Sequence, residues 1–484
     1  MNTERAFIIE QDEFDYSLWS LCQSHPEIRA EELRDYILGI VFIRYISSIT
    51  TMPSLASHSE LQALANSIEL PKEASFDYIY TNRNRQNNHK RLVIAYNLIE
   101  EAIPPIRGAL SYLIDSRAIG DINNVLADII QAISEFELEL IRPELSTTFQ
   151  YFLELFDKAY IRKGDTATPP KALCDLVIEL MSVTPAHTIY DPACGTGGFL
   201  ISAQDTIAKD ALHPAFLFGE ERNSINGAYT KLTLLLLGVI DPEISKSHCL
   251  TNPVFMAGDS HQQQFNIVVS MPPFAMGNWG YDDAKHDPFN RFKRGLPPKS
   301  SGDYAYISHM LASARENTGL MAVVLPQGVL YRGAREAEIR QAFIKDNLLD
   351  AVIVLPEKLL INTNIPLAVL IFNKGKEDND VLFIDASQDF EAGKITNTLL
   401  PEHTSKIIQT YKKRECVDKY ATLATLANIQ DNNYNCNIPR YVDSSEEEKP
   451  VELSELNSER LQLLDYLDAT AKEINKYSSA LELR

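Results

Sequence analysis

The chain has 484 residues, 45% of them hydrophobic and 23% charged, and its formal net charge is −21 at pH 7. This length predicts two or three domains, and the composition predicts a soluble globular protein without a membrane helix, which needs about 20 consecutive apolar residues. The acidity argues against a protein that grips DNA alone, because Lys and Arg supply most of the affinity for phosphates. A DNA-processing role would therefore need local basic patches or a partner that holds the duplex.

The first residues and the cysteines indicate a reducing compartment. The stretch MNTERAFIIEQDEFDYSLWS lacks the apolar segment and cleavage site of a secretory signal. Six cysteines are scattered along the chain without a CxxC pair, so neither a zinc site nor a disulfide framework is expected. We expect a cytoplasmic protein with no metal site.

Residues 1–150 are expected to form a helical domain. Apolar residues recur at helical spacing in EELRDYILGIVFIRYIS, and INNVLADIIQAISEFELEL repeats the pattern. Between these stretches, residues 82–91 read NRNRQNNHKR, a basic run without an acid. This run is interpreted either as a solvated loop or as a patch that contacts phosphate.

Residues 151–405 alternate between strand and helix patterns, which predicts a parallel, doubly wound α/β sheet. Continuous apolar runs such as GLMAVVLP are typical of strands that are buried on both faces. The last two runs are joined by a short connection, which predicts an antiparallel hairpin at one edge of the sheet. The expected strands are HTIYD, AFLFGEE, FNIVVS, GLMAVVLP, LLDAVIVLP and PLAVLIFNK.

Residues 406–484 are expected to form a C-terminal segment with less regular structure. Residues 443–450, DSSEEEKP, read as a charged linker that precedes an amphipathic helix. The apolar stripe of this helix either packs on its own domain or docks on a partner helix. The stripe consists of Leu461, Leu464, Leu467, Ala471 and Ile474.

The stretch IYDPACGTGGFL predicts a ligand-binding loop between a strand and a helix. Gly195, Gly197 and Gly198 permit tight turning and close approach of the backbone to a ligand. A nicotinamide dinucleotide is the competing ligand, but the spacing is not GxGxxG. In addition, Asp191 would repel a pyrophosphate, whereas it could receive an ammonium group.

Two further acids complete the expected ligand site. Glu221 ends the next strand, where it can accept hydrogen bonds from ribose hydroxyls, and Asp259 follows as a contact for an adenine amine. A ligand with an ammonium, a ribose and no phosphate fits S-adenosylmethionine better than NAD. The loop contributes Asp191, Ala193, Gly195, Thr196 and Gly197 to this expected site.

Longer segments give the chain a specific family resemblance. They are DYILGIVFIRYIS, DPACGTGGFL, VVSMPPF, RFKRGLPPKSSGDYAYISHML, AVVLPQGVLYRGAREAEIR, LLDAVIVLP and DNNYNCNIPRYV. On these segments the chain resembles the modification (M) subunit of type I restriction–modification systems, a family of adenine-N6 DNA methyltransferases. The resemblance covers nearly the whole chain and implies a Rossmann-like, S-adenosylmethionine-dependent α/β sheet with an N-terminal helical domain and a C-terminal helical tail.

The resemblance also implies partners. Two M subunits generally join one specificity (S) subunit that reads the sequence of double-stranded DNA, and a restriction (R) subunit adds cleavage. The target adenine is flipped out of the duplex, because a stacked base cannot be reached. Delegating sequence reading to the S subunit would account for the acidity of this chain.

The stretch SMPPF stands where the family carries Asn-Pro-Pro-Phe. The family pattern implies that the Asn side chain and the carbonyl of the next proline accept the two hydrogens of the adenine amine, while the aromatic ring stacks on the base. Here Pro272 and Phe274 keep these roles, Pro273 completes the loop, and Met271 replaces the asparagine. A thioether is a weak acceptor, so Met271 predicts slow or absent methyl transfer.

A second departure lies in the segment that the family places over the methionine end of the cofactor. The family pattern Gly-x-Phe-Tyr-Thr-Pro reads GDTATP here, so Thr168 and Pro169 remain and the aromatic pair is Thr166 and Ala167. Two hypotheses therefore stay open. The chain is either a working methylation subunit with an altered site or a non-catalytic scaffold that binds DNA and cofactor.

Several charged residues between the expected strands have two interpretations. The family places DNA on the side of a basic loop, whose expected backbone contacts are Arg291, Lys293, Arg294 and Lys299. Asp303 is expected to cap the helix that it opens, and His309 to lie in the core or on a helix surface. Arg332 and Arg335 either cap a helix or contact phosphate.

Overall fold

The computed structural model describes residues 20, 23–25, 28–56, 58–114, 122–135, 149–150, 152–154, 156, 168–208, 215–257, 262–361, 363–444 and 453–480. It divides the chain into two units, Met1–Val442 and Asp443–Arg484.

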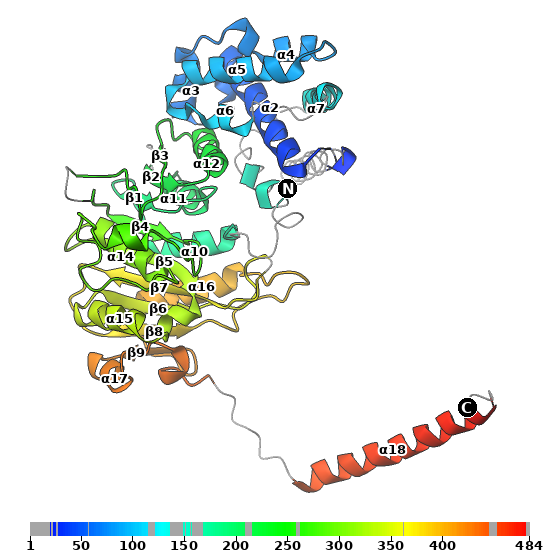
Figure 1. Cartoon of the computed structure of the whole chain (residues 1–484), viewed down its shortest axis with the longest axis vertical. Coiled ribbons are helices and arrows are strands. Elements are labelled where there is room, and N and C mark those ends of the chain that lie inside the picture. The colour runs from blue at the N-terminus through cyan, green and yellow to red at the C-terminus, as the bar shows by residue number, and fades with distance from the viewer. Residues whose placement is uncertain are drawn as a thin grey trace. The chain divides into compact units, whose positions relative to one another are not determined.

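The N-terminal part of the larger unit is helical (Figure 1). Its core consists of aliphatic and aromatic side chains from several helices, and α12 of the following region packs into the same core. Ile37, Ile40 and Val41 of the long helix α2 are fully buried, as the spacing predicts. The helices are α2 (Ala30–Thr51), α3 (Ser59–Ser67), α4 (Phe76–Asn82), α5 (Asn88–Ala102), α6 (Ala109–Leu113) and α7 (Asn123–Glu135), with short 3-10 helices η1 (Pro53–Leu55), η2 (Lys72–Ala74) and η3 (Pro104–Ile106).

A nine-stranded sheet follows, in the order β3-β2-β1-β4-β5-β7-β6-β8-β9. Strands β3, β2, β1, β4 and β5 are parallel, whereas β7 runs antiparallel to both β5 and β6. The strand order reverses between β1 and β4, which is the position where doubly wound sheets bind ligands. The strands are β1 (Thr188–Asp191), β2 (Phe216–Glu221), β3 (Glu243–Lys246), β4 (Ile267–Ser270), β5 (Leu320–Pro326), β6 (Leu349–Val354), β7 (Leu367–Asn373), β8 (Val381–Asp385) and β9 (Ala421–Ala424).

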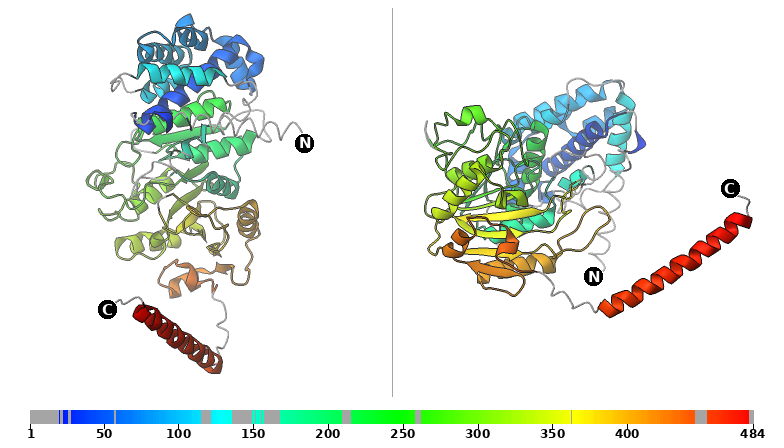
Figure 2. Two further views of the ribbon diagram at one scale, coloured as in Figure 1. Left: turned by 90° about the vertical axis from the view of Figure 1, so that its right-hand side faces the viewer. Right: turned by 60° about the horizontal axis from the view of Figure 1, so that its bottom comes forward.

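Helices cover both faces of the sheet (Figure 2). One core contains α10 (Lys171–Met181), α11 (Gly198–Ala208), the end of α12 (Ser224–Leu236) and α16 (Pro401–Lys413). The core on the other face contains α14 (Asp303–Ser313), α15 (Arg335–Lys345) and α17 (Leu426–Asp431). Burial on both faces explains why the strands read as continuous apolar runs. The remaining short helices are α13 (Tyr281–Ala284), η5 (Gln327–Leu330) and η6 (Ile438–Arg440).

The predicted α/β fold is confirmed, with one correction to its topology. The hairpin of β6 and β7 is antiparallel, but it does not lie at an edge, because β7 is inserted between β5 and β6. Strands β8 and β9 then extend the sheet beyond β6. An apolar run shows that a strand is buried but not which strands flank it, so the sequence pattern could not place this hairpin.

The smaller unit contains one long helix, α18 (Leu453–Ala480). Its apolar side chains are exposed, including Leu464, Leu467 and Ile474 of the expected stripe. In the part of the chain that the structure describes, no helix combines the length and hydropathy of a membrane span.

Candidate active site

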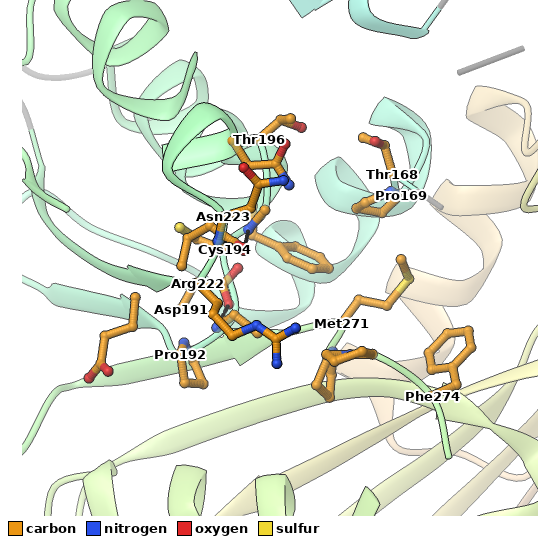
Figure 3. A pocket seen from close by; sticks show the side chains of 18 of the residues that line it. Thr168, Pro169, Asp191, Pro192, Cys194, Thr196, Arg222, Asn223, Met271 and Phe274 are labelled. Carbon is orange, nitrogen blue, oxygen red and sulfur yellow. Dashed lines mark hydrogen bonds between the residues drawn. The ribbon is translucent and has the colours of Figure 1, made fainter. Parts of the chain in front are cut away.

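The carboxyl ends of β1, β2 and β4 surround a cavity of about 1070 Å³ (Figure 3). Both loops singled out in the sequence, the one after β1 and the one after β4, form part of its wall. The predicted residues that line it are Thr168, Pro169, Asp191, Ala193, Gly195, Thr196, Glu221, Met271, Pro272, Pro273 and Phe274. Of the other predicted cofactor residues, Gly197 does not line the cavity, and Asp259 lies outside the described residues.

The glycine loop adopts a backbone that only glycine tolerates well. Gly195 and Gly197 have φ of +58° and +89°. The N–H of Gly195 donates to Oε2 of Glu221 at 3.0 Å, and the hydroxyl of Thr230 donates to the Gly195 carbonyl at 3.0 Å. A Cβ at Gly195 would meet open space, whereas a Cβ at Gly197 would lie 2.7 Å from Cγ2 of Thr230. Gly195 therefore keeps the cavity open, and Gly197 lets α12 pack against the loop.

Asp191 ends β1 beneath this loop and is almost fully buried. Its Oδ1 accepts hydrogen bonds from the Ala193 N–H at 3.0 Å and the Ser270 hydroxyl at 2.7 Å. Burial raises the pKa of Asp191 to about 7, although these two hydrogen bonds act in the opposite direction. A cationic ligand in the cavity would restore the ionised form, and Ser270 links this acid to the loop after β4.

Two consecutive acids end β2 and point to different surroundings, since side chains alternate along a strand. Glu221 bonds the loop, because its oxygens accept from the N–H groups of Gly195 and Asn223. Glu220 is fully buried and accepts from the hydroxyls of Tyr190 at 2.9 Å and Ser247 at 2.6 Å. The polar network around Glu220 fixes the end of β2, and no local pattern in the sequence marks it.

The loop after β4 presents Met271 to the cavity. Its side chain is only 7% exposed and packs in the core on the α10 side of the sheet. Pro272, Pro273 and the half-buried Phe274 also line the cavity, and Figure 3 shows Met271 and Phe274 on the same side of it. The loop ends at Ala275, whose φ of +47° is uncommon for a residue with a Cβ.

The buried carboxylate of Asp303, which pairs with the half-buried Arg332, holds this strained turn. The Ala275 N–H donates to Oδ1 of Asp303 at 2.8 Å, and the guanidinium of Arg332 pairs with the second carboxylate oxygen. Arg332 also pairs with Glu336, with 2.7 Å between Nε and Oε2. The expectation that Asp303 caps its helix is wrong, because Gly302 occupies the N-cap position and the Asp303 carboxylate serves the loop instead.

Comparison with known proteins assigns the family. Residues 142–450 match the family model described as N-6 DNA Methylase. The chain is 31% identical over 354 residues to the type I restriction enzyme MjaVII methylase subunit of Methanocaldococcus jannaschii, and the match covers 69% of this chain. The chain belongs to the N-6 DNA methylase family. It spans 60% of the length of the MjaVII subunit.

Other members of the family extend the similarity. The MjaIX methylase subunit of the same organism is 25% identical over 519 residues, with 97% of this chain and 91% of that protein covered. The type I restriction-modification methyltransferase subunit of Streptococcus thermophilus has the same fold, with a TM-score of 0.79, 25% identity, and coverage of 90% of this chain and 100% of that one. The resemblance to type I modification subunits, and with it the methyltransferase fold, is confirmed.

The structure corrects one residue of the predicted DNA-binding loop. Arg291 is 5% exposed, and its N–H groups donate to Asp287, to the carbonyls of Cys249 and Leu250, and to Nδ1 of His309. All the donors of this guanidinium are engaged inside the protein, so it cannot reach a phosphate. Arg291 instead fixes the loop to α14, and His309 is a core residue, as one of the two interpretations held.

The other three basic residues of the loop lie nearer the surface. Arg294 pairs with Asp346 at 2.6 Å, and Lys299 pairs with Asp282 at 3.0 Å. Lys293 is exposed. The Lys299 pair is exposed, and exposed pairs are weak and can exchange for a phosphate, whereas the Arg294 side chain is only 17% exposed. All three side chains remain predicted DNA contacts.

The basic run at residues 82–91 is partly used for internal bonding. The guanidinium of Arg91 donates to the carbonyls of Asn82, Arg85 and Gln86, which closes the turn before α5. Arg83 stacks on the ring of Tyr80 at 3.9 Å.

Arg335, for which two roles were open, donates to the hydroxyl of Tyr281 at 3.0 Å.

Several residues that line the cavity were not identified from the sequence. Their positions depend on contacts between segments that are far apart in the chain, and no local spacing marks them. Glu220 and Arg222 are exceptions, because they directly flank the predicted site residue Glu221. Those that bear on the chemistry are Arg34, Glu220, Arg222, Asn226, Thr363 and Ile365.

Proposed function

We propose that the chain is the methylation subunit of a type I restriction–modification system and transfers a methyl group from S-adenosylmethionine to N6 of adenine in DNA. One observation carries this proposal: a single cavity is lined by both the glycine loop after β1 and the Met271–Phe274 loop after β4. Methyl transfer requires a donor and an acceptor in one enclosed space, and positioning accounts for much of its acceleration.

The residues at the glycine loop fit the proposed cofactor. Asp191 offers a carboxylate for the ammonium of its amino-acid portion, and Glu221 offers acceptors for the ribose hydroxyls. The open space above Gly195 allows a ligand to approach the backbone closely. Thr168 and Pro169 line the same cavity and would cover the methionine end. When bound, the cofactor supplies an activated methyl group on its sulfonium.

The loop after β4 would hold the flipped adenine. The Pro272 carbonyl would accept one hydrogen of the amine, and the ring of Phe274 would stack on the base. Met271 cannot accept the second hydrogen well, because a thioether sulfur is a weak acceptor. Loss of one such contact costs about two to three orders of magnitude in rate. The proposed reaction would therefore be slow.

The position of Met271 supports a second candidate function. Its side chain is buried in the wall of the cavity, so a weakly accepting thioether stands where the family has the asparagine amide. In this alternative the chain is a silent methyltransferase homologue that serves as a DNA- and cofactor-binding scaffold in a defence complex.

Both functions would require partners. The net charge of −21 disfavours DNA binding by the chain alone, so a specificity subunit would hold and read the duplex, with two copies of this chain per specificity subunit and a restriction subunit added for cleavage. The exposed apolar side chains of α18 support a helix-mediated contact with such a subunit.

The test compares the natural chain with Met271→Asn. Each would be expressed with its cognate specificity subunit in a host without adenine methylation, and N6-methyladenine would be mapped by long-read sequencing. We expect Met271→Asn to raise methylation at a defined motif by about two orders of magnitude. Phe274→Ala in the Met271→Asn background is the control and should abolish the gain.

The outcomes separate the two candidates. Motif-specific methylation by the natural chain supports the enzymatic function. Methylation by Met271→Asn alone supports the silent homologue, with an otherwise intact site. If neither chain methylates DNA while the complex assembles, the methyltransferase proposal is wrong.

A further inference from the structure

Arg34 brings a positive charge from the N-terminal helical domain into the wall of the cavity. It lies in the second turn of α2, yet it lines the cavity together with Thr196, Asn226 and Tyr229 of the methyltransferase sheet region. Its side chain is 17% exposed, so it faces the cavity rather than bulk solvent. No local pattern in the sequence predicts a ligand contact at this position.

The guanidinium is held rigidly on one side only. Nε donates to Asp35 at 2.8 Å and to the Tyr229 hydroxyl at 3.1 Å, and Nη2 lies 2.8 Å from the same carboxylate. The guanidinium carbon lies 5.4 Å and 5.3 Å from the ring centres of Phe156 and Tyr229. Among the described residues, no side chain or carbonyl bonds Nη1, which leaves this nitrogen for a ligand.

Neighbouring residues also keep Arg34 charged and fix its position relative to the glycine loop. Burial alone would lower the pKa of Arg34, but Tyr229 and Asp35 raise it by more, so the pKa lies above the ordinary value for arginine. Tyr229 additionally donates to Asp35, which joins α2 to α12. The next residue of α12, Thr230, bonds the carbonyl of Gly195. One helix therefore positions both the arginine and the loop.

The charges in the cavity leave one group of the cofactor without a partner. S-adenosylmethionine carries an ammonium and a carboxylate, and the cavity offers Asp191 and Glu221 for the ammonium and the ribose. Two arginines line the cavity, Arg34 and Arg222. Arg222 directly follows Glu221, and Figure 3 shows its side chain directed toward Met271. Arg222 thus belongs to the ribose and base end.

We infer that Arg34 binds the carboxylate of the cofactor's amino-acid portion, so that the helical domain completes the cofactor site. This inference rests on the proposed function. A charge-assisted hydrogen bond to a carboxylate is stronger than a neutral one and is lost when either charge is removed. The two groups would then be bound by different domains: the ammonium by Asp191 of the sheet and the carboxylate by Arg34 of α2.

The experiment uses two ligands that differ in the amino-acid portion. Calorimetry on the full chain would measure the Kd for S-adenosylmethionine and for 5′-methylthioadenosine, which has the ribose and adenine but neither the ammonium nor the carboxylate. For Arg34→Gln we expect the Kd of S-adenosylmethionine to rise about 10- to 100-fold. The Kd of 5′-methylthioadenosine should change less than about twofold, because the contact that is lost does not involve it.

A second variant, Tyr229→Phe, keeps the ring under Arg34 and removes only the hydroxyl. It tests the inference even if Arg34→Gln does not fold. It should weaken S-adenosylmethionine binding by about three- to tenfold and leave 5′-methylthioadenosine binding unchanged. Thermal unfolding without ligand would confirm that each variant is folded.

The inference is overturned if Arg34→Gln weakens both ligands equally, because Arg34 would then only support the fold, or if it weakens neither. A natural chain that binds neither ligand would overturn the proposed function together with the inference. If the natural chain binds both ligands and Arg34→Gln weakens both equally, only the inference is overturned and the proposed function stands.

Discussion

The cavity has two ends, named after the ligands proposed for them: the cofactor end at the glycine loop after β1 and the base end at the loop after β4. They are built by different means. At the cofactor end, glycines supply the positive φ angles, and the loop bonds to Glu221 of the adjacent strand and Thr230 of the next helix. At the base end, Ala275 adopts a positive φ although it has a Cβ. This turn depends on Asp303, 28 positions further along the chain, and on its pairing with Arg332.

The two ends therefore differ in which residues determine their conformation. The cofactor end is specified mainly by residues of one strand–loop–helix unit and its neighbour, so its conformation is built into the local sequence. The base end is imposed by the buried carboxylate of Asp303 and by the half-buried Arg332, which come from two distant segments. A change at Asp303 or Arg332 would therefore disturb the base end without touching the loop itself.

Removing Asp303 should have the largest effect, because it breaks the base end alone. In Asp303→Ala the Ala275 N–H loses its acceptor and Arg332 keeps only Glu336. We expect the free energy of unfolding to fall by about 4 kcal/mol, because the Ala275 N–H and Arg332 each lose a hydrogen bond to a charged group, worth about 2 kcal/mol each. Urea denaturation would measure the loss, and calorimetry with S-adenosylmethionine should show that the cofactor end still binds.

Asp303→Asn is the matched control. The amide oxygen can still accept from Ala275, so this variant loses the ion pair but keeps the backbone hydrogen bond, and its loss should be about half as large. An Asp303→Ala variant as stable as the natural chain would contradict the view that this pair holds the loop.

The second prediction concerns the pH dependence of the cofactor end. Burial raises the pKa of Asp191 to about 7, well above its value of 3.8 in an unfolded chain. The folded state therefore binds this proton more tightly than the unfolded state between pH 4 and pH 7. The contribution of Asp191 to stability falls as the pH rises through this window and stays low above it.

Asp191→Asn removes this titration. Relative to the natural chain, its free energy of unfolding should increase by about 3 kcal/mol between pH 4 and pH 8. Urea denaturation at several pH values would measure the difference, and a difference that does not change with pH would contradict the raised pKa. The same variant should bind S-adenosylmethionine more weakly at pH 8, since the partner of its ammonium is lost.

The two glycines of the cofactor loop should separate stability from binding. Gly197→Ala places a Cβ 2.7 Å from Cγ2 of Thr230 at a φ of +89°, so we expect a loss of about 2 kcal/mol in the free energy of unfolding. Gly195→Ala has space for its Cβ and should lose only about 1 kcal/mol. Because that Cβ enters the cavity, Gly195→Ala should weaken cofactor binding more than its effect on stability suggests. Equal effects in both assays would refute this distinction.

The sequence predicted much of the fold because buried parallel strands and amphipathic helices have strong periodic patterns. It also predicted that Asp191, Gly195 and Glu221 lie together, because they stand at fixed positions around strand ends; their binding of a cofactor stays a prediction. At the base end it predicted the residues Met271–Phe274, which do line the cavity, but not the contacts that hold their loop. Asp303 has the position of a helix cap in the sequence, and only the three-dimensional structure shows its carboxylate bonded to Ala275.

Other failures have the same physical origin. The contacts of Arg34 with α12 and of Arg291 with His309 join segments that are far apart in the chain, and no spacing rule encodes them. Strands β3 and β9 have only four residues each, too few to show a strand pattern, so pairing with a neighbouring strand makes them strands.

The smallest effect is expected at Ala334, a strained residue close in sequence to Arg332. Ala334, next to the loop that carries Arg332, has φ of 54° and ψ of −134°, a combination that glycine adopts far more easily than alanine. Ala334→Gly should relieve about 1–3 kcal/mol of strain and lose about 0.5–1 kcal/mol to the greater freedom of the unfolded chain. The net gain should be about 1 kcal/mol in the free energy of unfolding.

Ala337→Gly makes the same chemical change inside α15, where the backbone is relaxed, and should instead lose about 1 kcal/mol. Urea denaturation of the two variants side by side would therefore show shifts of opposite sign. Losses of the same size in both would mean that Ala334 is not strained. Opposite shifts would show that the segment carrying Arg332, which helps to hold the base end, is itself kept in a conformation that its sequence resists.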